Sequence, residues 1–361
     1  MTAAPTTLPS RLLAAGTWLA PVLAWLAIAV GTGPAITGVV LVAVVLAAVH
    51  HAETVAHRIG EPFGTLVLAV AVTVIEVGLI LSLMLANPET TSSLARDTVF
   101  AAAMIILNFL LGLCLLVGGF RLGEQRFTRT GVTAALSTLA TLIVLTLILP
   151  NFTSTVPGPV YSPLQLGFVA VCSLVLYLTF VFVQTIRHRA YFLPSAEMRE
   201  LHRDEAPRPS VRQAWQSFAL LCVSLVAVVL MAKSLSNPLE DAVAAAGLPL
   251  AMVGVAIAGI VLLPESVAAV RAARAGQLQT SLNLALGSAL ATIGLTIPAV
   301  TVASFILDLP LALGLRPSSM ALLALTLFIA SLSIARGRTT VLHGAVHLVI
   351  FGAFILTNIA P

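Results

Sequence analysis

Long apolar stretches recur along this 361-residue chain, and short polar segments separate them. A helix of about 20 apolar residues crosses the hydrocarbon layer of a bilayer. The stretches lack the alternation of apolar and polar positions that strands of a membrane barrel show. We therefore predict an all-α polytopic membrane protein with eleven transmembrane helices. The predicted spans are residues 14–31, 34–50, 62–86, 98–119, 131–149, 164–186, 216–233, 242–263, 280–304, 318–335 and 341–358.

One polar segment is longer than the others and divides the chain. It carries mixed charges and several prolines, a composition typical of a linker. Apart from the first span, five spans precede it and five follow it. An odd number of spans reverses the direction of insertion, so the two halves can form inverted repeats. We predict an extra N-terminal helix (1–33), a first five-helix repeat (34–186), a cytosolic linker (187–214) and a second five-helix repeat (215–361).

The composition agrees with a membrane protein. Hydrophobic residues make up 59% of the chain, charged residues 9%, and the mean hydropathy is +1.07, whereas soluble domains carry about 25% charged residues. Soluble enzymes and nucleic-acid-binding proteins are thereby excluded. Cys114, Cys172 and Cys222 all lie in apolar stretches, where a thiol behaves as a small hydrophobe. We therefore predict neither a disulfide nor a metal site from them.

The basic residues indicate the orientation. Threading the spans alternately through a membrane places fifteen Lys and Arg residues on one side and only Arg96, Lys233 and Arg316 on the other. Because Lys and Arg accumulate on the cytoplasmic side, we expect a multi-pass protein of the cell inner (plasma) membrane. Its N-terminus and linker would be cytoplasmic and its C-terminus outside.

One acidic residue falls near the middle of a clear span. Glu76 follows an apolar run that begins at Thr65. A charged side chain at the centre of a helix costs about 2.5–3.5 kcal/mol on insertion scales, so such residues usually serve transport. Thr73 stands one turn earlier on the same face. A helix-packing glutamate that is protonated or hydrogen-bonded is the structural alternative.

The second half offers a counterpart. Glu265 directly follows Pro264, which removes a backbone donor and is expected to interrupt the helix. Interrupted helices build ion sites in transporters. The stretch from 242 to 276 is also too long for one straight crossing, so it must break, tilt or project from the membrane. If the membrane ends near Leu263, Glu265 is instead an acid that starts a helix at the interface.

Other polar residues in the spans can complete a cation site. Asn108 stands alone in an apolar run of the first half, and Ser288 and Thr292 lie in the matching helix of the second half. Together with the two acids they offer carboxylate, amide and hydroxyl oxygens, which hard cations such as calcium prefer. Two carboxylates neutralise one divalent ion, and without a metal they take up protons. A site that holds either a cation or protons meets the requirement of an antiporter.

Several segments resemble those of a known family: HHAETVAHRIGEPFG (50–64), TVIEV (73–77), QTIRHRAYF (184–192), LPES (263–266) and QTSLNLALGSALATIGLTIP (279–298). The chain resembles the calcium/cation exchanger superfamily, its cation/proton exchanger branch and, within that branch, the bacterial ChaA-type calcium/proton antiporters. The resemblance implies two inverted repeats with Glu76 and Glu265 as central acids. It also implies coordinating neighbours at Asn108, Ser288 and Thr292.

The chain departs from that family in two respects. Exchangers of plants and yeast carry Gly-Asn-Ala before each acid, whereas residues 72–75 here read Val-Thr-Val-Ile and residues 261–264 read Val-Leu-Leu-Pro. This difference leaves ion selectivity open. The linker also lacks a strongly acidic strip, because its acidic residues are balanced by arginines.

The histidines form two further groups. His50, Glu53 and His57 share one helical face at the end of the second span, and His51 and Glu61 lie nearby in the sequence. They form an interfacial polar cluster, a site that attracts metal ions or, because imidazole titrates near neutrality, a pH sensor. His343 and His347 are four residues apart on the last helix, and we expect them to serve packing or interfacial hydrogen bonding rather than zinc binding or proton relay.

The leading interpretation is secondary active transport, in which calcium is exchanged for protons by alternating access. A sodium or potassium/proton antiporter on the same site is the main alternative. An intramembrane hydrolase is remote, because the sequence lacks H-E-x-x-H and G-x-S-x-G motifs, so we do not expect an enzyme; a passive channel needs no pair of carboxylates. The expected partners are transported calcium, sodium or potassium ions, protons and lipid, with no resident cofactor and no nucleic acid.

Overall fold

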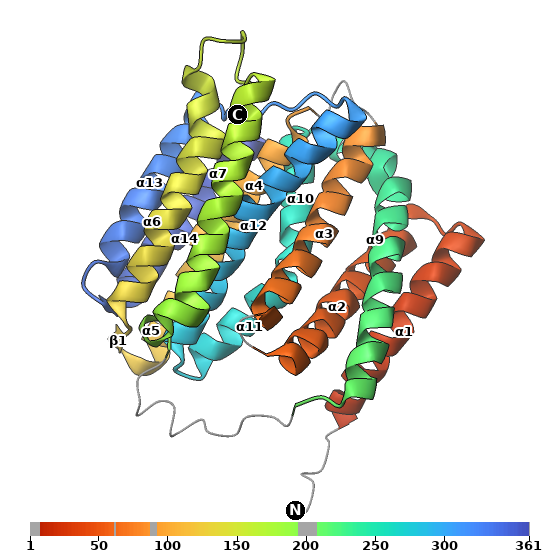
Figure 1. Cartoon of the computed structure of the whole chain (residues 1–361), viewed down its shortest axis with the longest axis horizontal. Coiled ribbons are helices and arrows are strands. Elements are labelled where there is room, and N and C mark those ends of the chain that lie inside the picture. The colour runs from red at the N-terminus through yellow and green to blue at the C-terminus, as the bar shows by residue number, and fades with distance from the viewer. Residues whose placement is uncertain (1–7, 61–62, 87–91, 194–207, 361) are drawn as a thin grey trace, which may run out of the picture. The chain divides into compact units, whose positions relative to one another are not determined.

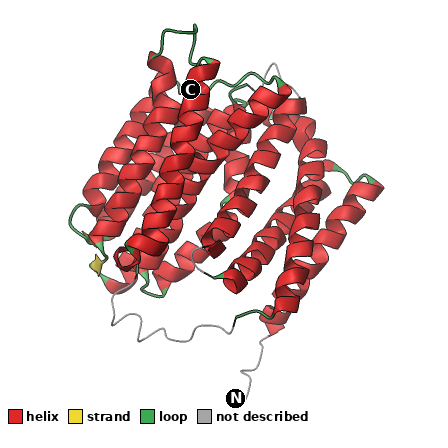
Figure 2. Cartoon of the chain, viewed as in Figure 1, coloured by secondary structure: helices red, strands yellow, loops and turns green. Residues whose placement is uncertain are grey.

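The computed structural model describes residues 8–60, 63–86, 92–193 and 208–360. Figure 2 shows that helices dominate these segments. The chain forms two compact units, Met1–Ala86 with Pro207–Leu239 and Asn87–Ala206 with Glu240–Pro361. Each unit combines segments from both sides of the linker, since the units are defined by contacts and not by chain order. The proposed division into two inverted repeats therefore stays a prediction.

The first unit contains the helices α1 (Leu8–Val30), α2 (Pro34–Ile59) and α3 (Phe63–Ala86) and most of α9 (Val211–Ala245). Helix α2 packs against both α1 and α3 (Figure 1). Helix α9 contacts α3 closely at Gly78, where an added β carbon would lie 2.7 Å from Val229 Cγ2. The Ser82 hydroxyl of α3 donates to the Val229 carbonyl at 3.3 Å. These contacts join helices from both sides of the linker within one unit.

The second unit contains the remaining elements. Its α-helices are α4 (Leu94–Met104), α5 (Leu111–Leu122), α6 (Arg129–Ile143), α7 (Pro163–Phe182), α10 (Ala251–Val261), α11 (Leu263–Arg274), α12 (Leu278–Leu307), α13 (Pro317–Ile334) and α14 (Val341–Ile359). Three π-helical turns, η1 (Ile105–Leu110), η2 (Val144–Ile148) and η4 (Val183–Arg187), and two 3₁₀ turns, η3 (Leu149–Phe152) and η5 (Arg189–Tyr191), continue these helices. The strands β1 (Gln125–Arg126) and β2 (Arg338–Thr339) pair antiparallel.

Glycines set the closest helix contacts of the second unit. Helices α5 and α14 meet at Gly112 and Gly344, where a β carbon on Gly344 would lie 2.7 Å from Gly112 O and 2.6 Å from Leu116 N. Helix α10 approaches α4 at Gly254, and α12 approaches α7 at Gly294. Without a hydrophobic force between helices in lipid, small residues that admit close backbone approach stabilise such pairs. The span formed by α4, η1 and α5 is 83% buried.

Within the described residues, nine helices are long and apolar enough to cross a membrane. The bent pair α10–α11 can supply a tenth, and the apolar part of α1, Gly16–Val30, is shorter. The structure thus shows an all-helical protein with nine or ten candidate spans, and the count of eleven stays a prediction.

One predicted span was placed wrongly at its start. Residues 242–245 belong to the end of α9, and α10 begins at Ala251. Gly247 ends α9 with a φ of 68°, a left-handed conformation that favours glycine, and the Leu248 amide donates to the Val243 carbonyl at 3.0 Å. Pro238, by contrast, lies inside α9 without ending it. Apolar composition alone did not separate the two helices, although Gly247 and Pro249 mark the turn.

Loops that the sequence placed on the same side lie together at the ends of the second unit. Arg121 donates to the Arg274 carbonyl at 2.9 Å, and Arg129 donates to the Ala335 carbonyl at 3.2 Å. Figure 1 shows β1 beside the start of α6 at this end. The loops predicted for the other side also meet, since Arg96 donates to the Gly314 carbonyl at 3.1 Å. Within the second unit, these contacts agree with the predicted alternation of loops between the two ends of the spans.

The glycine contact between α5 and α14 gives a first testable expectation. Gly344→Ala should lower the midpoint of thermal unfolding in detergent, because overpacking of this kind costs about 1–3 kcal/mol and the atoms in the way belong to the backbone. The matched control is Gly352→Ala on the same helix, where an added β carbon meets nothing within 4 Å. Equal midpoints for the two variants would show that the contact is not tight.

Candidate cation site

The first unit contributes an acid in the middle of a continuous helix. Glu76 lies near the centre of the 24-residue α3 and is only 2% exposed. Thr73, one turn earlier, is 8% exposed. Helix α3 is continuous through Glu76, and the side chain of Glu76 is buried within the protein. The structure thereby keeps Thr73 and Glu76 together as a buried polar pair on one helix.

The second unit contributes an acid beside a helix break. Helices α10 and α11 meet at an angle of 55°, and the break lies at Leu262. Pro264 stands in the first turn of α11, where a missing backbone donor costs least. Glu265 follows it, half-buried, in the same first turn, where the helix dipole favours a negative charge. The predicted interruption is confirmed, while the depth of Glu265 in the membrane stays a prediction.

Asn108 lies inside the π-helical turn η1 and is fully buried. Its Nδ2 donates to Thr326 Oγ1 at 2.9 Å, and its Oδ1 lies 3.3 Å from His347 Nδ1. Thr326 belongs to α13 and His347 to α14, so three elements meet at this amide. Turns of the π type are frequent at functional sites. The role of Asn108 as a cation ligand stays a prediction, and its contact with His347 was not expected.

Ser288 and Thr292 are four residues apart on α12, which places them on one face. Thr292 is 3% exposed and Ser288 is half-buried. Helix α12 packs against η1 and α11, the elements that carry Asn108 and Glu265. The predicted residues of the second unit are thus on contacting elements.

The six candidate residues are divided between the units. Thr73 and Glu76 belong to the first unit, and the other four belong to the second. Their joint binding of one cation stays a prediction.

No cluster of three or more His, Cys, Asp or Glu residues able to hold a metal occurs in the described part of the chain. A cation there would have to use amide, hydroxyl or backbone oxygens in addition to carboxylates.

The first group of histidines separates into exposed and buried members. His50, Glu53 and His57 are all exposed on α2, on the face that the sequence predicted. His51 is 1% exposed, and its ring nitrogens lie 3.1 Å from the Thr17 carbonyl and 3.4 Å from Ser217 Oγ. It thereby joins α2 to α1 and α9. Glu61 falls outside the described residues.

Sequence analysis did not identify the roles of His51 and His347. A signal was present for His51, because it continues the stripe of buried residues formed by Ala48 and Val55. His347 similarly continues a stripe through Gly344 and Ile350 on α14. His343 is half-buried, and its Nδ1 accepts from the Thr340 amide at 3.2 Å, which caps α14. Both histidines thus form hydrogen bonds, as expected in preference to zinc binding or proton relay, His347 as a buried polar residue and His343 as a helix cap.

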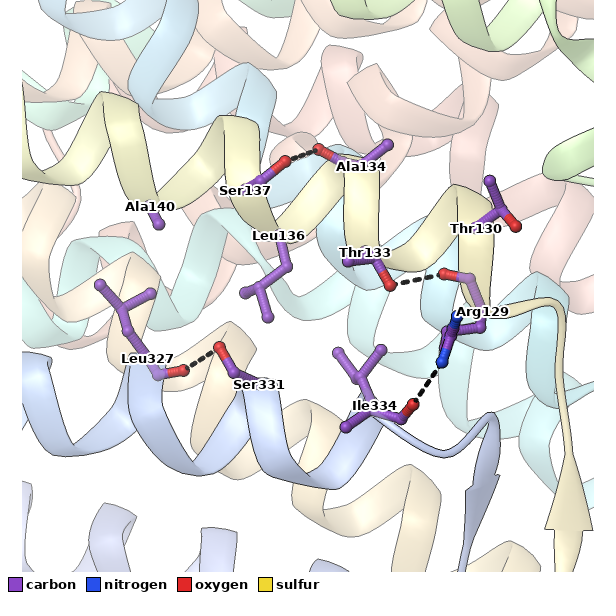
Figure 3. Close-up of a pocket in the computed structure, with 11 residues that line it drawn as sticks. Arg129, Thr130, Thr133, Ala134, Leu136, Ser137, Ala140, Leu327, Ser331 and Ile334 are labelled. Atoms are coloured by element: carbon purple, nitrogen blue, oxygen red, sulfur yellow. Dashed lines mark hydrogen bonds between the residues drawn. The ribbon is translucent and has the colours of Figure 1, made fainter.

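A pocket of about 610 Å³ opens between α6 and α13 in the second unit (Figure 3). Hydroxyl side chains on its wall bond to their own helices, as Thr133 does to the Arg129 carbonyl at 2.7 Å and Ser331 to the Leu327 carbonyl at 2.8 Å. None of the six candidate cation-site residues lines this pocket. It is therefore separate from the predicted site.

Comparison with known sequences identifies the family. The family described as sodium/calcium exchanger protein matches residues 15–186 and 216–360. The chain belongs to the sodium/calcium exchanger family. The two matched segments lie on either side of the linker. The predicted membership in the calcium/cation exchanger superfamily, and in its cation/proton branch, is thereby confirmed.

Three related proteins are transporters by name. The protein y4hA of Sinorhizobium fredii, provisionally named an ionic transporter, is 49% identical over 321 residues, covering 89% of this chain and 87% of that protein. The sodium-potassium/proton antiporter ChaA of Escherichia coli is 34% identical, with 86% and 84% covered. The Ca²⁺/H⁺ antiporter of Aphanothece halophytica is 24% identical, with 74% and 76% covered.

Solved structures agree on the fold. The structure of native YfkE superposes with a TM-score of 0.73 at 16% identity, covering 97% of this chain and 99% of that one. The H⁺/Ca²⁺ exchanger CAX gives the same TM-score at 13% identity, with 96% and 88% covered. This family member is therefore a multi-pass membrane protein with an exchanger-type fold, and two of its relatives are named antiporters.

The contrast between two adjacent histidines can be tested. His51→Leu should lower the midpoint of thermal unfolding, because it removes both bonds that join α2 to α1 and α9, and each such bond contributes about 0.5–1.5 kcal/mol. His50→Leu on the exposed face is the control, with an unchanged midpoint in differential scanning fluorimetry. A larger loss for His50→Leu would contradict this assignment.

Proposed function

We propose that this protein is a calcium/proton antiporter in which Glu76 and Glu265 bind calcium or protons in turn during alternating access. The observation that carries the proposal is the burial of the Glu76 carboxylate in the middle of a membrane-crossing helix. A charge in that position is expensive, and either a cation or a proton can neutralise it. Occupation by one at a time couples their movements.

The chemistry of the candidate residues supports a hard cation. Glu265 offers a second carboxylate beside a break in its helix, and Asn108, Ser288 and Thr292 offer amide and hydroxyl oxygens. Calcium takes six to eight oxygen ligands in flexible geometry. Two carboxylates balance the charge of one divalent ion, which is the reason for preferring calcium.

A sodium or potassium/proton antiporter is the second candidate. It is favoured by the 34% identity to a sodium-potassium/proton antiporter, which exceeds the 24% identity to a Ca²⁺/H⁺ antiporter. The same oxygen ligands bind monovalent cations, so geometry and charge balance decide between them.

We also propose an inner-membrane location in which the end of the second unit with β1 and β2 faces the cytoplasm. Arginines of three loops lie there, including Arg121, Arg129 and Arg338. Cytoplasmic loops carry such an excess of basic residues. The N-terminus would then be cytoplasmic and the C-terminus outside.

The two acids provide the direct test. Glu76→Gln and Glu265→Gln should each abolish cation-driven proton movement in inverted membrane vesicles, because glutamine neither releases a proton nor neutralises a cation. Glu124→Gln is the matched control, since Glu124 is exposed and pairs with Arg338 at 3.2 Å. Immunoblotting of the membranes checks insertion. Wild-type rates in either variant would refute the assignment.

Ion selectivity is tested in the same vesicles. When a pH-sensitive dye reports proton release, calcium should give the largest response at the lowest concentration, followed by sodium and potassium, with magnesium as a fourth cation. Vesicles with Glu76→Gln supply the background. A larger response to sodium or potassium would establish the second candidate, and no response to any cation would reject both.

A further inference from the structure

A chain of buried hydrogen bonds runs through Asn108 in the second unit. Asn108 Nδ2 donates to Thr326 Oγ1, and the Thr326 hydroxyl donates to the Leu322 carbonyl at 2.8 Å. On the other side, His347 Nδ1 lies 3.3 Å from Asn108 Oδ1, and His347 Nε2 lies 3.2 Å from Ser333 Oγ. Asn108, Thr326 and His347 are 0% exposed and Ser333 is 3% exposed.

The partners fix the direction of each bond. Because the Thr326 hydrogen goes to a carbonyl, Thr326 Oγ1 accepts from the Asn108 amide. Asn108 Oδ1 therefore faces His347 Nδ1, and an amide oxygen only accepts, so Nδ1 carries the ring hydrogen. In the neutral ring Nε2 then accepts, and the Ser333 hydroxyl is its donor.

This arrangement prevents the Asn108 amide from turning over. A reversed amide would place its NH₂ group against the N–H of His347 and its oxygen against a hydroxyl that already donates elsewhere. With the ring hydrogen on Nδ1, two buried polar contacts would be lost, and each unsatisfied buried group costs about 1–3 kcal/mol. Thr326 and His347 together therefore determine which atom of Asn108 faces which neighbour.

The helix contact that carries His347 is also close. Gly344 lies one turn before His347, and Gly112 lies one turn after Asn108. A β carbon on Gly112 would be 3.0 Å from both Gly344 O and His347 Cβ. Main-chain atoms of α5 and α14 are therefore in direct contact at this point, and neither glycine leaves room for a side chain. The distance between His347 and Asn108 is consequently set by main-chain packing.

We propose that His347 is a positioning residue that sets cation affinity and selectivity by holding the Asn108 amide oxygen in one orientation. The proposal rests on the proposed antiport function, with Asn108 as a ligand. An amide oxygen has two lone pairs, so Asn108 Oδ1 accepts from His347 and still offers one lone pair to a cation. Outer partners that orient a ligand typically affect metal affinity about 10–100-fold.

The test compares two replacements of His347. His347→Leu removes the donor, whereas His347→Asn keeps an N–H donor at the position of Nδ1. We expect His347→Leu to raise the half-saturating calcium concentration about tenfold and to change the calcium-to-sodium ratio, while His347→Asn stays within about threefold of wild type. The maximal rate per inserted protein should change little in either variant.

Ser333 supplies an independent variant that keeps the histidine. Ser333→Ala removes the donor to Nε2, loosens the choice of tautomer and should raise the half-saturating concentration by a smaller factor, about two- to threefold. Ser331→Ala is its matched control, because the exposed Ser331 hydroxyl bonds to its own helix. The control should match wild type.

A purely structural histidine gives a different result. Lower insertion or maximal rate in His347→Leu with an unchanged half-saturating concentration would overturn the proposal, as would failure of His347→Asn to restore affinity in folded protein. Cation-dependent thermal stabilisation of purified protein separates this from the proposed function. Suppose that wild type shows no antiport. The positioning role is then overturned as well if the cation stabilises wild type and His347→Leu equally, or stabilises neither.

Discussion

The absence of water in the interior of a bilayer governs this structure. Every backbone polar group there must find a partner within the protein, because an unsatisfied group costs several kcal/mol. Many serine and threonine hydroxyls bond to the carbonyl one turn earlier, as Thr146 does to Leu142 at 2.8 Å, whereas those of Thr98, Ser173, Ser224 and Thr301 are buried without a partner in the described structure. Larger polar side chains are held by several helices. Asn108, which contacts Thr326 on α13 and His347 on α14, is such a case.

Two departures from regular helix lie at candidate residues. Asn108 occupies a π-helical turn, and Glu265 follows a 55° break. Each irregularity reorients backbone groups in a region where the surrounding helices must compensate, which requires tight packing. The glycines that face one another on α5 and α14 supply that packing. An irregular backbone within a membrane domain is tolerated where it is enclosed by protein, and the burial of the α4–η1–α5 span satisfies this condition.

The sequence predicted the class, the spans in outline and the break at Pro264, because hydrophobic length and proline chemistry are local properties. It also selected Glu76 and Asn108, whose burial the structure confirms, since isolated polar residues stand out against an apolar run. It did not predict that α9 continues to Ala245 or that β1 and β2 pair. It likewise missed the partners of Asn108, because His347 is 239 residues away in the chain. Contacts between distant helices depend on packing, which periodicity does not encode.

Helix α9 contains an internal proline, Pro238. It is one continuous helix, yet its residues through Leu239 belong to one unit and those from Glu240 to the other. Pro238 lies beside this change and lacks the amide hydrogen that would close the preceding turn. The helix therefore lacks one main-chain hydrogen bond close to the residue at which its unit changes. Sharp kinks in long helices occur at proline, so Pro238 is the position at which we expect α9 to bend.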